Sequence, residues 1–229
     1  WGDSPAVAYG RALACGRMSA FWSVVASNRP ADGGRAEALS KLFVEVVLAP
    51  AFETEALEIF ARKRNLRVLE CPVEAADAGP ELRGIDGGFL AQSPDVEPDD
   101  TTSWECVTER APSEAEARAL ALAWRVVRQV RSNAIVVANE RQTVGIGAGQ
   151  MSRVDSCRIA IDKAQLPLAG TAAGSDAFFP FADGVEVLAE AGVTAVAQPG
   201  GSKRDDEVVA AANERGMAMV MTGRRHFRH

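Results

Sequence analysis

The sequence predicts an α/β protein in which helices flank mixed β-sheets. Three observations support this prediction. Apolar strand-like segments alternate with helical segments along the 229 residues, polar capping signals mark helix starts, and one pair of strands is separated only by a short polar turn. Similar β-α pieces occur in both halves of the chain. We therefore expect two related α/β domains.

The first half of the chain is predicted to contain two β-α repeats. A helix begins at Ser4, followed by a proline that suits the first helical turn, and it ends near Gly16. Residues 72–103 are rich in Pro, Gly and Asp, which favours a long connection or a domain boundary. The predicted strands cover 21–26, 43–49 and 66–71, and a helical face includes 57–61.

The second half begins with a strong helix signal. Ser113 and Glu116 form a capping box at the start of a long amphipathic helix. A strand pair, a helix from about Ser152 and a final strand–helix–strand repeat are predicted to follow. The predicted ranges are 134–138 and 143–148 for the strand pair, and 194–197, 206–215 and 217–221 for the repeat.

The composition argues against several classes of protein. A net charge of -6 and a pI of about 5.1 disfavour a nucleic-acid partner. The sequence has no run of 18 apolar residues, so no membrane span is predicted. The cysteines are scattered, and the histidines lie only at 226 and 229, which disfavours a zinc site. Isolated cysteines without a signal peptide indicate a reducing, cytoplasmic environment.

The most informative segment, residues 175–181, reads Ser-Asp-Ala-Phe-Phe-Pro-Phe. Its aromatic spacing fits neither a strand nor a helix, and Pro180 blocks a helix at this point. Aromatic rings on an irregular segment beside an acid are typical of the wall of a ligand site. A hydrophobic plug beneath a loop is the alternative interpretation, and the segment alone does not decide between them.

Two glycine-rich turns join strands to helices. Residues 145–149 have the spacing G-x-G-x-G, which matches neither a dinucleotide fingerprint nor a P-loop. This turn could contact an anionic ligand or serve tight packing. In the second turn, residues 198–206, the pair Asp205–Asp206 is expected to cap the following helix.

The basic C-terminal tail is a further candidate for ligand binding. A guanidinium such as that of Arg225 suits phosphate capture, and Phe227 could anchor the tail against the body of the protein. No Ser/His/Asp triad can be placed in the sequence. The chain therefore contains binding groups without a recognisable catalytic set.

Several long motifs in register resemble the AICAR transformylase family, the C-terminal half of a bifunctional purine-biosynthesis enzyme. The motifs are GIGAGQMSR, SDAFFPF, the terminal RHFRH, RMSAF, FVEVVLAP, RSNAI and QPGGSKRDDEV. The resemblance runs almost from end to end and is weakest across residues 72–103.

The resemblance implies formyl transfer from 10-formyltetrahydrofolate to the 5-amino group of AICAR, within purine biosynthesis in the cytoplasm. It implies two cytidine-deaminase-like α/β domains, the remainder of the first at 1–105 and the second at 106–229. It also implies an intertwined homodimer with shared sites, no zinc, and a monovalent cation near Asp176 and His229.

The resemblance also implies site residues. On the AICAR side these are Glu45, Asn133, Ser152, Arg225 and Phe227. On the folate side they are Met18, Trp22, Arg153, Val154, Phe178, Pro180, Phe181 and Asp183.

The sequence departs from the family pattern in three places. The K-H-x-N-P-C-G motif, whose lysine and histidine serve catalysis in the family, is absent from this sequence, so no catalytic residue is predicted. It would precede Trp1, which suggests missing upstream sequence. Trp22 stands where the family has glycine, and Ala182 stands where arginine is common. A catalytically impaired or repurposed paralogue, binding an AICAR-like nucleotide or using another amine, therefore remains an alternative.

Overall fold

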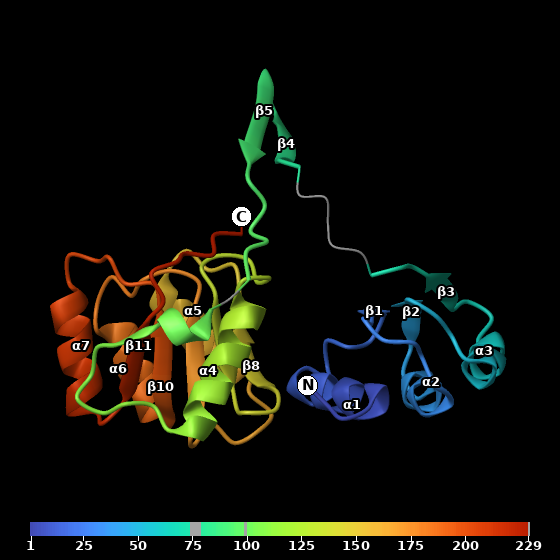
Figure 1. Ribbon diagram of the computed structural model, residues 1–229, viewed down its shortest axis with the longest axis horizontal. Helices are drawn as coiled ribbons and strands as arrows, with labels where there is room; N and C mark the ends of the chain where they lie inside the picture. The colour runs from blue at the N-terminus through green and yellow to red at the C-terminus, as the bar shows by residue number, and fades with distance from the viewer. Residues whose placement is uncertain (74–78, 99, 229) are drawn as a thin grey trace.

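The computed structural model describes residues 1–73, 79–98 and 100–228. These residues form two α/β parts connected through a β-hairpin (Figure 1). None of the helices in these ranges is long and apolar enough to cross a membrane.

The first part is a three-stranded parallel sheet with helices on one side (Figure 1). Its core joins β2 to α2 and α3 through side chains that include Val47, Leu39 and Phe60. Proline at the first turn and the Ser4 hydroxyl, which accepts a hydrogen bond from the Val7 amide, start α1 as predicted. The elements are α1 (Pro5–Cys15), β1 (Ser23–Ala26), α2 (Gly33–Ser40), β2 (Val44–Ala49), α3 (Thr54–Ala61) and β3 (Arg67–Glu70).

The second face of this sheet carries apolar side chains that are not covered by a helix of the described chain. Val24 on β1 and Leu69 on β3 are exposed, and strand pairing places them on the face opposite the helices. Val25 and Val47, which alternate with them, point into the core.

The second part is a six-stranded mixed sheet with the strand order β6-β11-β10-β9-β7-β8. Strands β9, β10 and β11 are parallel, whereas β7, β8 and β6 add antiparallel pairs. The elements are β6 (Glu105–Cys106), α4 (Glu114–Val127), β7 (Ile135–Ala138), β8 (Thr143–Gly147), α5 (Arg153–Asp162), β9 (Thr171–Ser175), α6 (Asp183–Glu190), β10 (Val193–Gln198), α7 (Asp205–Glu214) and β11 (Ala218–Met221).

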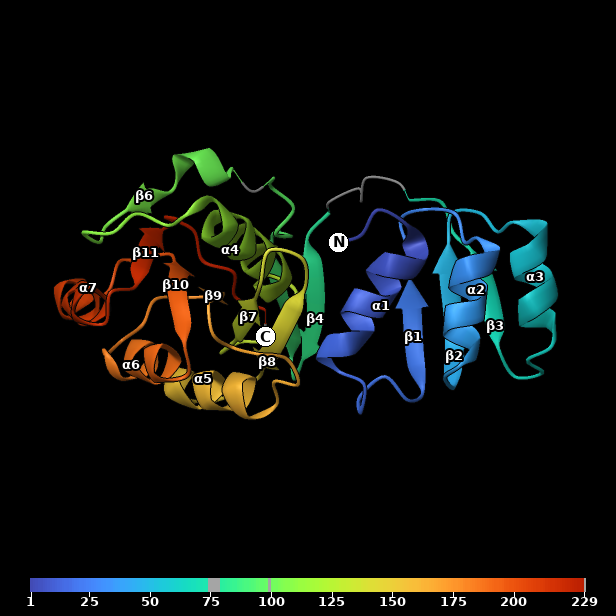
Figure 2. The ribbon, with the colours of Figure 1, turned by 90° about the horizontal axis from the view of Figure 1, so that it is seen from below.

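Helices cover both faces of this sheet, which confirms the predicted α/β class (Figure 2). On one face α4 buries Trp124 and Leu120 against the strands. On the other, α5, α6 and α7 bury residues such as Leu188 and Val208. The predicted capping box of Ser113 and Glu116 opens α4.

The two parts repeat one sequence of elements. The run α1-β1-α2-β2-α3-β3 matches α5-β9-α6-β10-α7-β11, and both parallel strand triplets have the same order. The sequence Ala-Asp-Gly stands at the start of the middle helix in each, at 31–33 and 182–184. Helix α4 and strands β7 and β8 have no counterpart among the described residues of the first part.

Residues 72–103, predicted as a connection, contain an unpredicted hairpin of β4 (Glu81–Ile85) and β5 (Gly88–Gln92). It projects from both α/β parts (Figure 1), and its apolar side chains Leu82, Phe89 and Leu90 are exposed. A 3₁₀ turn, Thr101–Ser103, follows. The predicted domain boundary at 105/106 falls within β6, which pairs with β11.

The sequence prediction omitted α2, β9 and α6. Helix α2 begins with Gly33-Gly34, which have low helix propensity. Strand β9 contains only small side chains because α4 packs close to it: a Cβ on Gly174 would lie 2.9 Å from the carbonyl carbon of Ala123. Neither segment therefore has the apolar periodicity that identifies an element.

Candidate functional site

One cavity in the second part collects ten of the thirteen predicted site residues. Its volume is ≈ 440 Å³. These ten are Asn133, Ser152, Arg153, Val154, Phe178, Pro180, Phe181, Asp183, Arg225 and Phe227. Met151 and Ala177 complete the lining, and we call this cavity the second-part pocket.

Four segments bring these residues together. The first lies between β8 and the start of α5, and the second connects β9 to α6. The third is the C-terminal tail after β11, and the fourth is the connection from α4 to β7, which carries Asn133. Parallel strands β9 and β11 both end at this edge of the sheet, which is where ligands bind in open α/β sheets.

The aromatic segment serves both of the functions that its sequence left open. Phe179 is fully buried, packs in the core, and donates its amide to Oε1 of Gln198 at 2.9 Å. Phe178, Pro180 and Phe181 line the second-part pocket instead. Phe179 is therefore the plug, and its neighbours form the wall.

A buried ion pair organises the floor of the pocket. Arg153 Nη1 lies 2.5 Å from Asp176 Oδ1, with the two side chains 5% and 0% exposed. Asp176 also accepts hydrogen bonds from the Ser132 hydroxyl and the Ala134 amide. Removing one partner of such a pair leaves an uncompensated buried charge.

This ion pair also fixes the orientation of Asn133. Arg153 Nη2 donates to Asn133 Oδ1 at 2.7 Å. The Asn133 amide nitrogen donates to the carbonyls of Gln150 and Met151 at 2.9 and 3.3 Å. The side chain is therefore held at both ends, and the remaining lone pair of Oδ1 is the group that it can offer to a ligand.

Arg225 supplies a cation at the rim of the pocket. Its guanidinium lies over the Phe178 ring, with Cζ 4.9 Å from the ring centroid. Gly201 lies beside it, and the φ of 91° at Gly201 is a conformation that strains any other residue. An anion at the rim can thus meet a guanidinium that is already oriented by stacking.

Two glycines of the glycine-rich segment before α5, Gly145 and Gly147, lie in β8 and allow close packing. A Cβ on Gly145 or Gly147 would lie 1.9 Å from the carbonyl oxygen of Ala160 or Ser156, respectively, so both glycines let β8 approach α5. The residues of this region that line the pocket are 151–154.

The predicted cap of α7 has a different geometry. Arg204 occupies the N-cap position, and Asp205 Oδ2 accepts the amides of Gly201 and Ser202 at 2.7 and 3.2 Å. Asp205 and Asp206 stand in the first turn, where acidic side chains complement the helix dipole. The prediction was therefore wrong about the cap itself, and Asp205 instead fixes the loop beside Arg225.

Three predicted site residues do not line the second-part pocket. Met18, Trp22 and Glu45 belong to the first part, before β1 and within β2. Glu45 is engaged there, since Oε2 accepts Trp22 Nε1 at 2.5 Å and Oε1 accepts Arg67 Nη1 at 2.9 Å. Met18 and Trp22 are 85% and 64% exposed.

Trp22 adopts a backbone conformation that suits glycine. Its φ is 63°, and it is the only non-glycine residue with positive φ in the described part of the chain. Its ring contacts Phe21 and Phe43 edge-on, with centroids 6.4 and 5.8 Å away. The left-handed region costs a non-glycine residue about 1–2 kcal/mol.

We expect Trp22→Gly to be more stable than Trp22→Ala by about 1 kcal/mol, because glycine relieves the left-handed strain that alanine retains. Both variants lose the indole equally, so the comparison isolates the backbone. Urea unfolding of the two variants measures the difference. Equal midpoints with equal slopes would contradict this account of residue 22.

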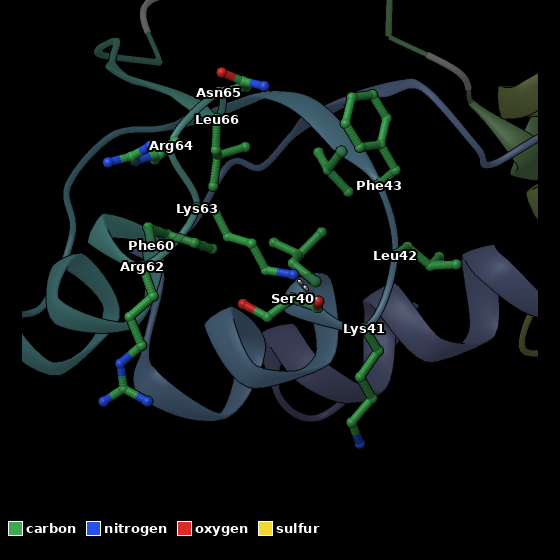
Figure 3. A pocket seen from close by; sticks show the side chains of 12 residues that line it. Ser40, Lys41, Leu42, Phe43, Phe60, Arg62, Lys63, Arg64, Asn65 and Leu66 are labelled. Atoms are coloured by element: carbon green, nitrogen blue, oxygen red, sulfur yellow. Dashed lines mark hydrogen bonds between the residues drawn. The ribbon is translucent and has the colours of Figure 1, made fainter.

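A second hollow, in the first part, does not resemble a ligand site. It has a volume of ≈ 540 Å³, lies near the ends of α2 and α3, and contains none of the predicted residues. Figure 3 shows the charged ends of Lys41, Arg62 and Arg64 directed away from it. Lys63 reaches across it, but its Nζ is bound to the Ser40 carbonyl at 2.7 Å.

The described residues do not form a metal site. They contain no cluster of three or more His, Cys, Asp or Glu side chains suited to a metal ion. The carboxylate of Asp176, near which a monovalent cation was expected, is paired with the buried guanidinium of Arg153, and the cation itself stays a prediction. His229, the other residue expected near this cation, lies outside the described residues.

Cys157, on α5, is buried in the core and does not line the second-part pocket. Burial raises the pKa of its thiol to about 12, so it stays protonated at neutral pH. The residues that sequence reasoning missed are Met151 and Ala177 in the lining. The ion-pair role of Asp176 was missed as well, although its place beside the aromatic segment was a usable signal.

Fold and site together define an α/β protein with a small-molecule pocket where parallel strands end. A model of the family described as "AICARFT/IMPCHase bienzyme" matches residues 1–163. The chain belongs to this family.

Relatives with similar sequences carry the name "Bifunctional purine biosynthesis protein PurH". That of Magnetococcus marinus is 53% identical over 225 residues, which cover 93% of this chain and 42% of the relative. That of Chloroflexus aurantiacus is 52% identical over 227 residues, covering 97% and 44%. A third, from Cereibacter sphaeroides, is 52% identical over 240 aligned positions, covering 100% and 45%. The chain thus spans less than half the length of these relatives.

Proposed function

We propose that this chain takes part in formyl transfer from 10-formyltetrahydrofolate to the 5-amino group of AICAR, in cytoplasmic purine biosynthesis. The observation that carries the proposal is the second-part pocket, which collects ten residues that the family resemblance singled out. Family membership and relatives named for purine biosynthesis support the same reaction.

The nucleotide is proposed to bind at the side of the pocket near the C-terminal tail. Arg225 pairs with the 5′-phosphate, since a planar guanidinium binds phosphate through two parallel hydrogen bonds. Phe227 packs against the nucleotide, and Asn133 Oδ1 accepts a hydrogen bond from the base or its carboxamide. Ser152 stands beside Asn133 on the same rim.

The folate is proposed to bind along the aromatic wall. Phe178, Pro180 and Phe181 offer flat apolar surface to the pterin ring system. Asp183 accepts hydrogen bonds from the pterin; its Oδ1 holds the Gly184 amide at 2.7 Å, which orients the carboxylate. Val154 completes this wall, and Arg153 acts from below it by fixing Asn133.

We further propose that the protein is a homodimer of chains with two cytidine-deaminase-like domains each, divided at 105/106. Met18, Trp22 and Glu45 would then serve the pocket of the partner subunit. The exposure of Met18, Trp22 and the β4–β5 hairpin supports an interface. The repeat of six elements in both parts supports two related domains.

The reaction itself tests the proposal. The protein carrying this chain is mixed with AICAR and 10-formyltetrahydrofolate, and tetrahydrofolate is followed by its absorbance. We expect turnover that requires both substrates. A fast rate would exclude a catalytically impaired protein, because loss of one acid–base group lowers rates by about 10²–10⁴-fold. Absence of AICAR binding, or tetrahydrofolate release that does not depend on AICAR, would refute the assignment.

The second candidate is a catalytically impaired or repurposed paralogue. Trp22 favours it, because the indole holds Glu45 Oε2 at a position assigned to AICAR. This alternative predicts AICAR or folate binding without formyl transfer, or transfer to another amine. The folate and AICAR affinities of Trp22→Gly and of the unmodified protein separate the two candidates. If neither affinity changes, Trp22 does not alter the site and no longer supports the alternative.

A further inference from the structure

The C-terminal tail runs beside the segment that leaves the β4–β5 hairpin. Three contacts connect the two stretches in antiparallel order. Gln92 Nε2 donates to the Phe227 carbonyl at 3.4 Å, Asp95 pairs with His226 Nδ1, and Glu97 pairs with Arg224. We call the residues 92–97 and 224–227 the tail clamp.

The tail clamp is anchored to the second part at two points. Arg128, at the end of α4, donates from Nε to the Asp95 carbonyl at 2.9 Å and from Nη1 to the Glu97 carbonyl at 3.0 Å. His226 is 1% exposed, and its ring lies 4.5 Å from the Trp124 ring. The segment 92–97 is therefore held against a rigid helix.

The His226 backbone extends this anchoring to the pocket floor. Its amide donates to the Asp176 carbonyl at 2.8 Å, and Asp176 carries the buried ion pair with Arg153. The His226 Nε2 atom is buried without a partner among the described residues, so Nδ1 and its contact with Asp95 provide the polar attachment of the ring.

Neighbouring tail residues point in alternate directions, as in any extended segment. Arg224 and His226 contact Glu97 and Asp95, whereas Arg225 lies over Phe178 and Phe227 lines the second-part pocket. A tail held on one side by residues 92–97 thus presents its other side to the ligand. An exposed terminal segment would otherwise sample many orientations.

We propose that Asp95 and His226 are positioning residues that set Arg225 and Phe227 in the nucleotide site. This inference rests on the proposed function, which assigns the phosphate to Arg225. It makes residues 92–97, which are far from the C-terminal tail in sequence, a determinant of nucleotide affinity.

Asp95→Ala tests the proposal, with Asp86→Ala in the hairpin turn as the matched control. We expect Asp95→Ala to weaken AICAR binding by about 3- to 10-fold, within the range of coupled neighbouring residues. Binding of the riboside, which lacks the phosphate but still meets Phe227, should weaken less than AICAR binding, and AICAR binding by Asp86→Ala should stay unchanged. Equal weakening of nucleotide and riboside would overturn the inference.

A double-mutant cycle excludes a general structural effect. If Asp95 acts through Arg225, its replacement costs less affinity in an Arg225→Ala background than in the unmodified protein. Additive losses would show that Asp95 acts elsewhere, and would overturn the inference. Thermal unfolding of each variant confirms that the fold is retained.

Hydrogen exchange separates this inference from the proposed function. Without ligand, Asp95→Ala should speed amide exchange in residues 222–228, whereas Asp86→Ala should not. If the unmodified protein fails to bind AICAR, the proposed function falls, but the exchange result still decides whether the tail clamp exists. Unchanged exchange in Asp95→Ala would overturn the clamp itself.

Discussion

Replacing Asp176 with alanine is expected to lower the free energy of unfolding by about 3–5 kcal/mol. The reason is the Arg153 guanidinium, which is buried beside Asp176 and would keep its charge without a partner. The Ser132 hydroxyl and the Ala134 amide would lose their acceptor as well. Chemical denaturation monitored by fluorescence measures the change.

The matched control for this substitution lies on α5, the helix that carries Arg153. Arg158, also on α5, pairs with Asp155 at 3.1 Å, but these side chains are 58% and 51% exposed. Asp155→Ala should therefore cost no more than about 1 kcal/mol, as for other surface pairs. Similar losses for Asp155→Ala and Asp176→Ala would contradict the role assigned to burial.

The second large effect is expected at Arg225. Arg225→Ala should weaken AICAR binding by about 10- to 100-fold, because hydrogen bonds to a charged group contribute about 1.5–3 kcal/mol. Stability should change little, since the side chain is exposed and stacks on Phe178 at the rim. Titration calorimetry with AICAR provides the affinity.

Arg158→Ala provides the control for net charge, because it also removes one exposed guanidinium. We expect that variant to bind AICAR as the unmodified protein does. A comparable loss in both variants would mean that Arg225 contributes general electrostatic attraction, and the phosphate contact proposed for it would be wrong.

Elements with a strong local signal were predictable from the sequence. The Ser113–Glu116 capping box and the proline-started helix α1 were confirmed because their signals lie within one turn of the chain. Strand β9 was not predictable, since its small residues reflect the close approach of α4, which is a tertiary constraint. The β4–β5 hairpin lacks a buried face, so its sequence has no clear alternation.

In the candidate site, too, some features were predictable from short motifs and others were not. Motif resemblance singled out ten of the residues that line the second-part pocket, because they lie in four short sequence segments. The buried partnership of Arg153 with Asp176, and the clamp of Asp95 on His226, connect residues 23 and 131 positions apart. Such long-range pairs leave no local periodicity, so a single sequence does not predict them.

The glycine expected at position 22 illustrates what structure adds to a sequence departure. From the sequence, Trp22 was only an indole near a predicted pocket. The structure gives it a left-handed backbone and a hydrogen bond to Glu45. The departure therefore changes both backbone strain and the availability of a carboxylate, and each change has its own measurement.

The central claim is that the second-part pocket holds the nucleotide with its phosphate at Arg225. A crystal structure of the protein with AICAR tests this claim most directly. The account predicts phosphate oxygens within hydrogen-bonding distance of the Arg225 guanidinium and the base beside Asn133. A nucleotide bound with its phosphate away from Arg225, or in the hollow near the ends of α2 and α3, would contradict it.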